Sequence, residues 1–320
     1  VERGRIYVRG VDGAPDLRQV LGVHSFSPAL EIERDFERLK RTVELFYPVL
    51  RGRRDFRVSC QRIAKDFSPD SMGVERELGR LIEAGTGVPV RLKDPDAELH
   101  VEIGPRRIYL FSEKVPGFGG FPVGSSGKLL SLLSGGIDSP VATFLMMKRG
   151  VLPVLLHFSV SEVETAKVRR LRDRLQEFAA GEELKLIVIP REEIFLGRLP
   201  ELYGTRYEPY VCVLCKYRMH KTAAEVARRE GALGIVTGDN LAQVASQTLK
   251  NLLASRAAAV LPVYSPLIAF EKNETVALAR RIGTYEISIA AAEGCTPPRD
   301  PKTGVDPQRL QKVLRATGLE

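Results

Sequence analysis

From residue 128 onward the chain alternates between short apolar runs and amphipathic segments, and this rhythm constrains the fold most. The runs are KLLSLL, VLPVLLHFS, LKLIVIP and LGIVTGD, and none shows regular polar alternation. Helix-like segments such as SPVATFLMMKRG and ETAKVRRLRDRLQEFAA separate them. Strands that are apolar on both faces and separated by helices form a parallel sheet covered on both sides. We therefore expect a doubly wound, mostly parallel α/β domain over residues 128–320.

The segment SGGIDSP follows the first of these runs directly. In an open α/β sheet ligands bind beyond the carboxyl ends of the strands, and the first strand-to-helix turn is the usual phosphate site. Gly135 and Gly136 let the backbone approach a ligand closely, while the free N–H groups of the following helix attract an anion. Ser134 and Ser139 add hydroxyl donors, and Asp138 suggests a magnesium ion or a positioning role. A plain glycine turn with a serine or aspartate cap is the alternative.

Two commoner nucleotide-binding motifs are excluded. GSSGK resembles the end of a Walker loop, but that motif requires glycine where Pro122 stands and serine or threonine where Leu129 stands. No G-x-G-x-x-G opens the helix after SGGIDS. The pattern therefore supports neither a Walker-type nucleotidase nor a dinucleotide-binding domain.

The residues before 128 read as small α+β pieces. RIYVRG is strand-like, and Ile32, Phe36, Leu39 and Val43 recur at helical spacing. An amphipathic helix, DSMGVERELGRLIEAGTG, and strand-like ELHVEIG and RRIYLFSEK follow. The glycine- and proline-rich VPGFGGFPVGSSG is typical of a linker. These patterns predict domains over 1–54, 55–115 and 128–320, with a linker over 116–127.

The charge balance favours a polyanionic partner. The chain has 48 Lys and Arg against 40 Asp and Glu, a net charge of +8. RGRRDFRVSCQRIAK concentrates six cations in what we interpret as a phosphate-contact stripe: Arg51, Arg53, Arg54, Arg57, Arg62 and Lys65. A solvated basic surface is the alternative.

The composition is that of an ordinary globular protein, with 44% hydrophobic and 28% charged residues. No apolar run approaches the ~18 residues of a membrane span, and VERGRIYVRG lacks the apolar core of a signal peptide. We expect a cytoplasmic protein without a membrane partner. Because the chain begins with Val1, we also expect further residues upstream.

SGGIDSP resembles the PP-loop of ATP pyrophosphatases, which split ATP into AMP and pyrophosphate to adenylate a substrate. GFGGFPVGSSGKLLSLLSGGIDSPVA, TGDNLAQVASQTLKNL and PLIAFEKNETVALARRIGTYEISI resemble the tRNA 4-thiouridine synthetases, also called tRNA uracil 4-sulfurtransferases. FRVSCQRIAKDFSPDS resembles their THUMP domain, and residues 1–50 resemble the end of their N-terminal ferredoxin-like domain. The implied fold is a Rossmann-like PP-loop ATPase domain over 128–320, preceded by ferredoxin-like (1–54) and THUMP (55–115) domains.

The resemblance implies a set of ATP contacts: Leu132, Leu133, Ser134, Gly135, Gly136, Asp138, Ser139, His157, Phe158, Lys216, Gly238 and Gln247. Lys216 stands where the family has an arginine, so the charge is kept and the planar fork is lost. Taken alone, His157 also fits a hydrogen-bonded core histidine, Gly238 a loop glycine and Gln247 a helix-face amide.

The implied reaction is ATP-dependent adenylation of O4 of uridine 8 in tRNA, followed by replacement with sulfur to give 4-thiouridine. Asp138 would be catalytic, and Mg²⁺ and backbone donors would stabilise the departing pyrophosphate. The expected partners are tRNA, gripped by the THUMP domain, and a sulfur donor, either free sulfide or a cysteine desulfurase. Relatives with a sulfur-carrying rhodanese domain continue past residue 320, so we expect none here. The resemblance is compatible with a homodimer.

Four cysteines do not make a disulfide scaffold. Cys212 and Cys215 form a C-x-x-C, and Cys295 matches the family's catalytic cysteine, which carries persulfide or forms a disulfide. Archaeal-type relatives combine all three to bind an iron–sulfur cluster, and three thiolates suit a [4Fe–4S] cluster with one open iron. The alternatives are persulfide or disulfide chemistry without a cluster, zinc with His220 as fourth ligand, or plain packing, which we expect for Cys60.

Two other function classes share part of this pattern. Another PP-loop synthetase, amide-forming or tRNA-modifying, would carry SGGIDS but would not need the THUMP-like segment. A non-catalytic RNA-binding module with a relic nucleotide site would fit the charge. It would leave the intact glycine and aspartate pattern unexplained.

Overall fold

The computed structural model describes residues 5–9, 16–292 and 294–320. They divide into two compact units, the first comprising residues up to Arg18 together with 24–117, and the second comprising 19–23 together with 118–320. Residues 1–4 and 10–15 of the domain expected over 1–54 lie outside the described residues.

The first unit is a four-stranded sheet with helices packed on one face. The strand order is β2 (Leu30–Glu33), β5 (Arg107–Phe111), β4 (Ala97–Ile103) and β3 (Phe56–Arg62), in which only β3 and β4 run parallel. The other elements are α1 (Phe36–Thr42), η1 (Val43–Phe46), α2 (Tyr47–Leu50), α3 (Ser71–Thr86) and the paired short strands β1 (Ser25–Phe26) and β6 (Val115–Pro116).

The boundary expected after residue 54 cuts through this sheet and its core. Ile32, on β2, pairs with Ile108 on β5, and Leu39 and Val43 are buried together with Phe56 from β3. Ile32 therefore lies on a strand rather than on the predicted helix, which begins only after the Asp35 cap. The apolar residues of β2 and α1 pack in the same core, and their combined spacing in the sequence imitates that of one helix.

The second unit contains a five-stranded parallel sheet in the order β11 (Val263–Tyr264), β10 (Ile235–Val236), β7 (Lys128–Leu132), β8 (Leu152–Ser159) and β9 (Leu186–Pro190). The strand order reverses between β7 and β10, which makes this a doubly wound sheet with a switch point there. The predicted fold class is confirmed.

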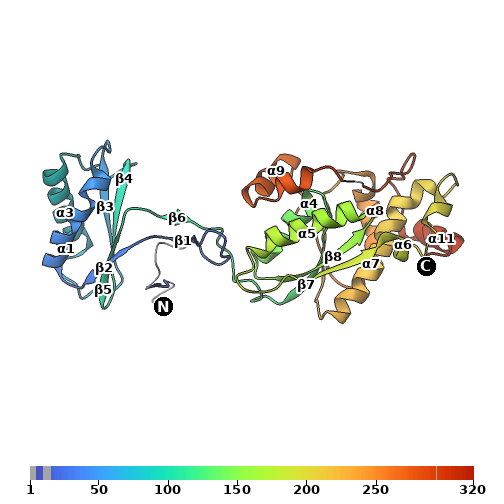
Figure 1. Cartoon of the computed structure of the whole chain (residues 1–320), viewed down its shortest axis with the longest axis horizontal. Coiled ribbons are helices and arrows are strands. Elements are labelled where there is room, and N and C mark those ends of the chain that lie inside the picture. Colours follow the sequence, from blue (N-terminus) through green and yellow to red (C-terminus); the bar gives the residue numbers. More distant parts are fainter. Residues whose placement is uncertain (1–4, 10–15, 293) are drawn as a thin grey trace. The chain divides into compact units, whose positions relative to one another are not determined.

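Helices cover both faces of this sheet (Figure 1). Leu129 and Leu155 are buried against α4 (Asp138–Met147), α5 (Glu162–Gln176) and α9 (Lys272–Arg281). Leu130 and Leu156 are buried against α6 (Arg191–Ile194), α7 (Val211–Arg229), α8 (Leu249–Arg256) and α11 (Pro307–Thr317). Because neighbouring strand residues point to opposite faces, the unbroken apolar runs supply both cores. The remaining elements are η2 (Leu199–Leu202), η3 (Glu208–Tyr210), η4 (Ala245–Gln247) and α10 (Tyr285–Ile289).

The segment expected to be a linker over 116–127 packs onto the second unit for most of its length. The ring of Phe118 lies edge-on to Phe144 and Phe178, with centroids 5.1 and 5.5 Å away. Gly120 approaches the carbonyl of Lys148 so closely that a Cβ would lie 2.2 Å from its oxygen. Glycine and proline here serve close packing rather than free movement. Among the described helices, none is long and apolar enough to cross a membrane.

Candidate functional site

The PP-loop turn at the end of β7 is closed by its own serines. The Ser134 N–H donates to Ser139 Oγ at 2.8 Å, and the two hydroxyl oxygens lie 3.0 Å apart. Helix α4 begins at Asp138, and its cap residue, Ile137, contributes no side-chain hydrogen bond. The first N–H groups of α4 therefore remain available to an anionic ligand.

A cavity of about 230 Å³ lies where the chain leaves β7 and β10. Eleven of the twelve predicted ATP contacts line it: Leu132, Leu133, Ser134, Gly136, Asp138, Ser139, His157, Phe158, Lys216, Gly238 and Gln247. Gly135 is the exception, because it lies against Glu164 and Lys167, whose side chains approach a Cβ position within 3.5 and 3.3 Å. The predicted residues thus form one site at the switch point. Residues that the sequence analysis did not assign to ATP also line it, among them Met219, His220, Thr237 and Asp239.

Gly238 is where the turn after β10 meets the start of α4. A Cβ at this position would lie 2.7 Å from the Ser139 nitrogen and 2.9 Å from the Asp138 carbonyl carbon. Backbone atoms cannot move aside like the end of a flexible side chain. Only glycine allows this approach, so Gly238 shapes the cavity through its missing side chain.

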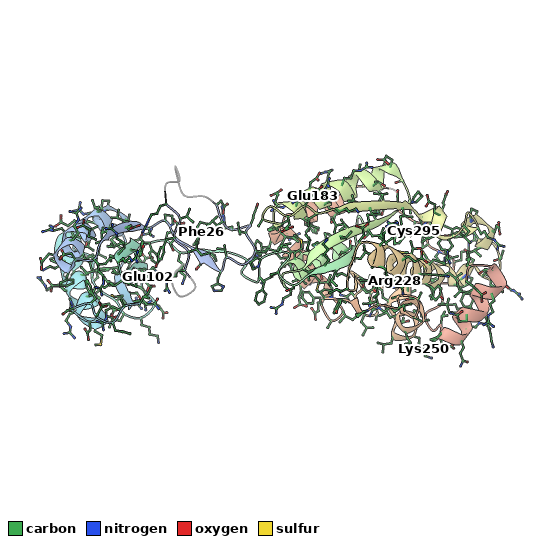
Figure 2. All side chains as sticks on the ribbon, turned by 90° about the horizontal axis from the view of Figure 1, so that it is seen from below. Phe26, Glu102, Glu183, Arg228, Lys250 and Cys295 are labelled. Atoms are coloured by element: carbon green, nitrogen blue, oxygen red, sulfur yellow. The ribbon has the colours of Figure 1, made fainter. Side chains whose placement is uncertain are left out.

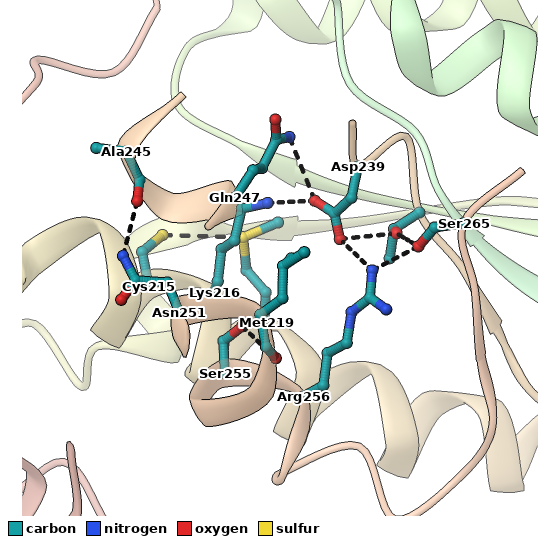
Figure 3. Close-up of polar contacts among 12 residues, drawn as sticks. Cys215, Lys216, Met219, Asp239, Ala245, Gln247, Asn251, Ser255, Arg256 and Ser265 are labelled. Atoms are coloured by element: carbon teal, nitrogen blue, oxygen red, sulfur yellow. Dashed lines mark hydrogen bonds and ion pairs between the residues drawn. The ribbon is translucent and has the colours of Figure 1, made fainter. Parts of the chain in front are cut away.

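Asp239 forms a buried charged network at one wall of the cavity (Figure 3). Its carboxylate accepts hydrogen bonds from Lys216, from Thr237 Oγ1 at 2.9 Å, from Gln247 Nε2 at 3.3 Å and from Arg256 Nη2 at 3.0 Å. Burial alone would raise the pKa of Asp239, but the Lys216 charge and these hydrogen bonds outweigh it and hold the pKa well below its ordinary value. Asp239 is therefore ionised.

Lys272, at the first position of α9, contacts the PP-loop aspartate. Its Nζ lies 2.9 and 3.0 Å from the two Asp138 carboxylate oxygens. The side chains are 45% and 25% exposed, so the pair lies at the open edge of the site. The sequence analysis did not assign Lys272, although it lies in the segment FEKNETVALARR, which carried part of the resemblance.

His157 is both a buried core histidine and a cavity residue. Its Nδ1 lies 3.0 Å from the Leu133 carbonyl oxygen, and its Nε2 lies 3.9 Å from Glu164 Oε2. Burial lowers the pKa of His157, and the nearby Glu164 charge opposes this only in part. The neutral imidazole therefore donates from Nδ1 to the residue that precedes the PP-loop, so the side chain supports the loop.

The three cysteines predicted to bind a metal are near one another but not assembled. Cys212 and Cys215 lie one turn apart on α7, and the Cys215 Sγ lies 3.8 Å from the Met219 sulfur. Burial raises the pKa of Cys215 to about 12 and also raises that of Cys212. Cys295 itself is exposed, in the segment after α10 (Figure 2).

Within residues 5–9, 16–292 and 294–320, the structure contains no group of three or more Cys, His, Asp or Glu side chains placed so that they could hold a metal ion. His220, the alternative zinc ligand, is buried and lines the cavity beside β7 and β10 instead. In the first unit Cys60 is a core residue, as expected, and burial raises its pKa to about 12.

Comparison with known proteins places the chain in a family. Residues 124–318 match the family described as thiamine biosynthesis protein (ThiI), and residues 33–113 match the THUMP domain. A probable tRNA sulfurtransferase of Methanothermobacter thermautotrophicus is 40% identical over 330 residues, covering 98% of this chain and 83% of the relative. One from Thermus thermophilus is 41% identical over 304 residues, covering 93% and 73%. The chain belongs to the tRNA sulfurtransferase family.

A solved structure resembles nearly all of the chain. The crystal structure of a 4-thiouridine synthetase–RNA complex with bound ATP has a TM-score of 0.86 and 32% identity, and covers 96% of this chain and 83% of that chain. These findings confirm the predicted family and enzyme class of this tRNA sulfurtransferase. The THUMP match, residues 33–113, covers β3, β4 and β5 and includes only the last residue of β2.

The basic stretch of this sulfurtransferase's THUMP unit is partly engaged in internal contacts. Arg57 Nη2 lies 2.7 Å from Glu98 Oε1, and Arg62 donates to the Phe67 carbonyl at 2.6 Å. Arg53 is exposed, and its side chain has no partner in the part of the chain that the structure describes. The side chains of this basic stretch therefore differ in their availability to bind a phosphate: Arg53 is available, whereas Arg57 and Arg62 already have partners within the protein.

Proposed function

We propose that this tRNA sulfurtransferase adenylates O4 of uridine 8 in tRNA with ATP and then replaces that oxygen with sulfur, giving 4-thiouridine. The observation that carries the proposal is the cavity between β7 and β10, in which eleven of twelve predicted ATP contacts meet. The related 4-thiouridine synthetase structure contains RNA and bound ATP, which supports both as substrates here.

In the first step uridine O4 attacks the α-phosphorus of ATP. The new O–P bond forms as the bond to pyrophosphate breaks, and the N3 proton of the uridine is released. The N–H groups of α4 and the ammonium groups of Lys216 and Lys272 would stabilise the phosphate charge that this step moves. Gly136 would let the backbone of the turn approach the phosphates closely, and Gly238 allows the turn after β10 to lie against the start of α4.

In the second step a sulfur nucleophile attacks C4, and AMP leaves with the original oxygen. With hydrosulfide as nucleophile, the sulfur proton moves to N3 and restores a neutral base. Free sulfide would supply the atom directly. Persulfide sulfur from a cysteine desulfurase would instead leave a C4–S–S–Cys bond after it displaces AMP, and a second thiol would have to cleave that bond, releasing the thiolated base and forming a disulfide.

Asp138 is the carboxylate that would hold Mg²⁺ against the pyrophosphate. Asp239 is saturated by four donors, whereas Asp138 is partly exposed and contacts only the mobile end of a lysine side chain among the described residues. A carboxylate at the start of a phosphate-binding helix fits a cation that keeps several waters. The ion would neutralise charge on the leaving group.

Cys212, Cys215 and Cys295 form the proposed sulfur site. The donor set suits a [4Fe–4S] cluster in kind, because three thiols leave one iron open to sulfide. A thiol binds a metal as the thiolate, so the raised pKa of Cys215 makes the required loss of its proton less favourable and metal binding dependent on pH. Without a cluster, exposed Cys295 would act as the sulfur carrier.

The test is nucleoside analysis of tRNA after incubation with protein, ATP, Mg²⁺ and sulfide. We expect 4-thiouridine in tRNA that carries uridine at position 8, none when that uridine is replaced by cytidine, and pyrophosphate release that depends on tRNA. Release without tRNA, or thiolation at another position, would favour a different PP-loop synthetase. Absence of turnover with retained tRNA binding would favour an RNA-binding module.

The same assay separates the sulfur chemistries. Anaerobically reconstituted protein should contain about four irons per chain, and Cys212→Ala, Cys215→Ala and Cys295→Ala should each abolish thiolation. Pyrophosphate release should persist in all three variants, because adenylation precedes sulfur insertion. Iron-free protein that still thiolates tRNA, or full activity of Cys212→Ala, would leave Cys295 as a lone sulfur carrier.

A further inference from the structure

The Asp239 network contains one cation more than charge balance requires. Lys216 and Arg256 both bind the same buried carboxylate, which is 5% exposed. Lys216 lines the ATP cavity, whereas Arg256 is not among its lining residues. Arg256 Nη2 also donates to Ser265 Oγ at 2.5 Å, which anchors it at the end of β11 (Figure 3).

We propose that Arg256 is a positioning residue that acts through Asp239 and leaves the Lys216 ammonium free to bind ATP phosphate. The inference rests on the proposed ATP site and adds a residue that does not touch the nucleotide.

The physical reason is the cost of an uncompensated buried charge. If Lys216 were the only cation on Asp239, turning its ammonium toward a phosphate would strip a buried carboxylate of its counterion, and such losses are strongly unfavourable. With Arg256 in place the carboxylate keeps a charged partner, together with the Thr237 hydroxyl. Lys216 can then be shared between Asp239 and the ligand.

The side chain of Gln247 is also oriented by Asp239. Its Nε2 donates to Asp239 at 3.3 Å, and this orients the amide so that the buried Oε1 has no hydrogen-bond partner in the described structure. Gln247 lines the cavity, so the unpartnered oxygen is suited to accept a hydrogen bond from a ligand hydroxyl or amino group. Asp239 thus orients two cavity side chains, and Arg256 holds Asp239.

The test uses two double-mutant cycles, one pairing Arg256 with Asp239 and the other pairing Arg256 with Lys216. For each variant the affinity for ATP is measured by calorimetry in the absence of tRNA, so that no turnover contributes to the signal. Arg256→Met should weaken ATP binding about tenfold, because Lys216 is then held by Asp239. Adding Asp239→Asn should bring the affinity back to within about threefold of wild type. In a Lys216→Met background, Arg256→Met should cause little further loss, because no ammonium remains to be released. Arg256→Lys should bind ATP better than Arg256→Met.

Arg228→Met is the matched control. Arg228 is an exposed cation twelve residues beyond Lys216 on α7, about 18 Å along the helix, and should leave ATP binding unchanged (Figure 2). Thermal unfolding and tRNA binding of each variant separate misfolding from lost positioning.

Two results would overturn the inference. A purely structural role predicts that Arg256→Met/Asp239→Asn binds ATP no better than Arg256→Met. A long-range charge effect predicts that Arg256→Met weakens binding equally with Lys216 present or absent. Wild-type protein that binds ATP with these couplings but does not thiolate tRNA would refute the proposed function and leave this inference standing. Protein that does not bind ATP would refute both.

Discussion

Substituting Gly238 by alanine tests whether the turn after β10 and the start of α4 must touch for ATP to be used. The added methyl group would lie 2.7 Å from the Ser139 nitrogen, and ordinary contact begins at 3.4 Å. The two backbones would therefore have to separate by about 0.7 Å, the difference between these values. Overpacking of this kind costs about 1–3 kcal/mol, which should lower the melting temperature by about 2–4 °C per kcal/mol in a unit of this size.

The effect on activity should exceed the effect on stability. Catalytic geometry tolerates displacements of about 0.5 Å, and misplacement near 1 Å can cost about 100-fold in rate. We expect Gly238→Ala to lower kcat/KM for ATP by about 100-fold in tRNA-dependent pyrophosphate release. Gly304→Ala is the control, because Gly304 is exposed and a Cβ there meets nothing within 4 Å. Wild-type kcat/KM in Gly238→Ala would refute the reasoning.

Three further predictions concern other parts of the chain. Asp138→Ala should retain the fold by circular dichroism but lose tRNA adenylation, since it removes the carboxylate held by Lys272; near-wild-type thiolation would remove the PP-loop assignment. Burial lowers the pKa of His220 from 6.5 to about 4, so the unfolded state binds the extra proton and the free energy of unfolding falls by about 3 kcal/mol as pH drops through that range. His220→Gln should reduce this loss in urea unfolding, and an unchanged pH dependence would contradict it. Arg53→Ala should flatten the salt dependence of tRNA binding by about 0.7–0.9, whereas Arg57→Ala should do so less because a carboxylate already pairs with it; equal slopes would contradict the distinction.

The sequence predicted the second unit better than the first. Unbroken apolar runs of β7, β8 and β9 are specific to a sheet buried on both faces, so the doubly wound fold followed from local pattern. In the first unit, β2 and α1 contribute to one core with β3, and their apolar residues mimicked a single helical stripe. Composition alone could not reveal that β2 pairs with β5, some 75 residues later, so it could not place the boundary outside this sheet.

Some residues of the candidate site could be assigned from the sequence, and others only from the structure. SGGIDSP could be assigned because a phosphate turn requires particular residues at adjacent positions, and that requirement is local. Gly238 could be assigned only through the family resemblance, because its close approach to the start of α4 joins residues far apart in the chain. Lys272 and Arg256 could not be assigned, since each becomes part of the site through a contact with a residue far away in the chain, Asp138 or Asp239. Nothing in the spacing of a lysine or arginine on an amphipathic helix distinguishes a partner of a buried carboxylate from a solvated cation.

The sequence by itself determined the alternation of strands and helices, the glycine turn at the end of the first strand and the identity of the thiols, because these depend on neighbouring residues. Only the tertiary structure decided which charges meet. Asp239 is ionised although buried because α7 and α8 bring Lys216 and Arg256 to it from opposite directions along the chain. Electrostatic energy depends on distance and burial in space, and neither can be read from the order of residues along the chain.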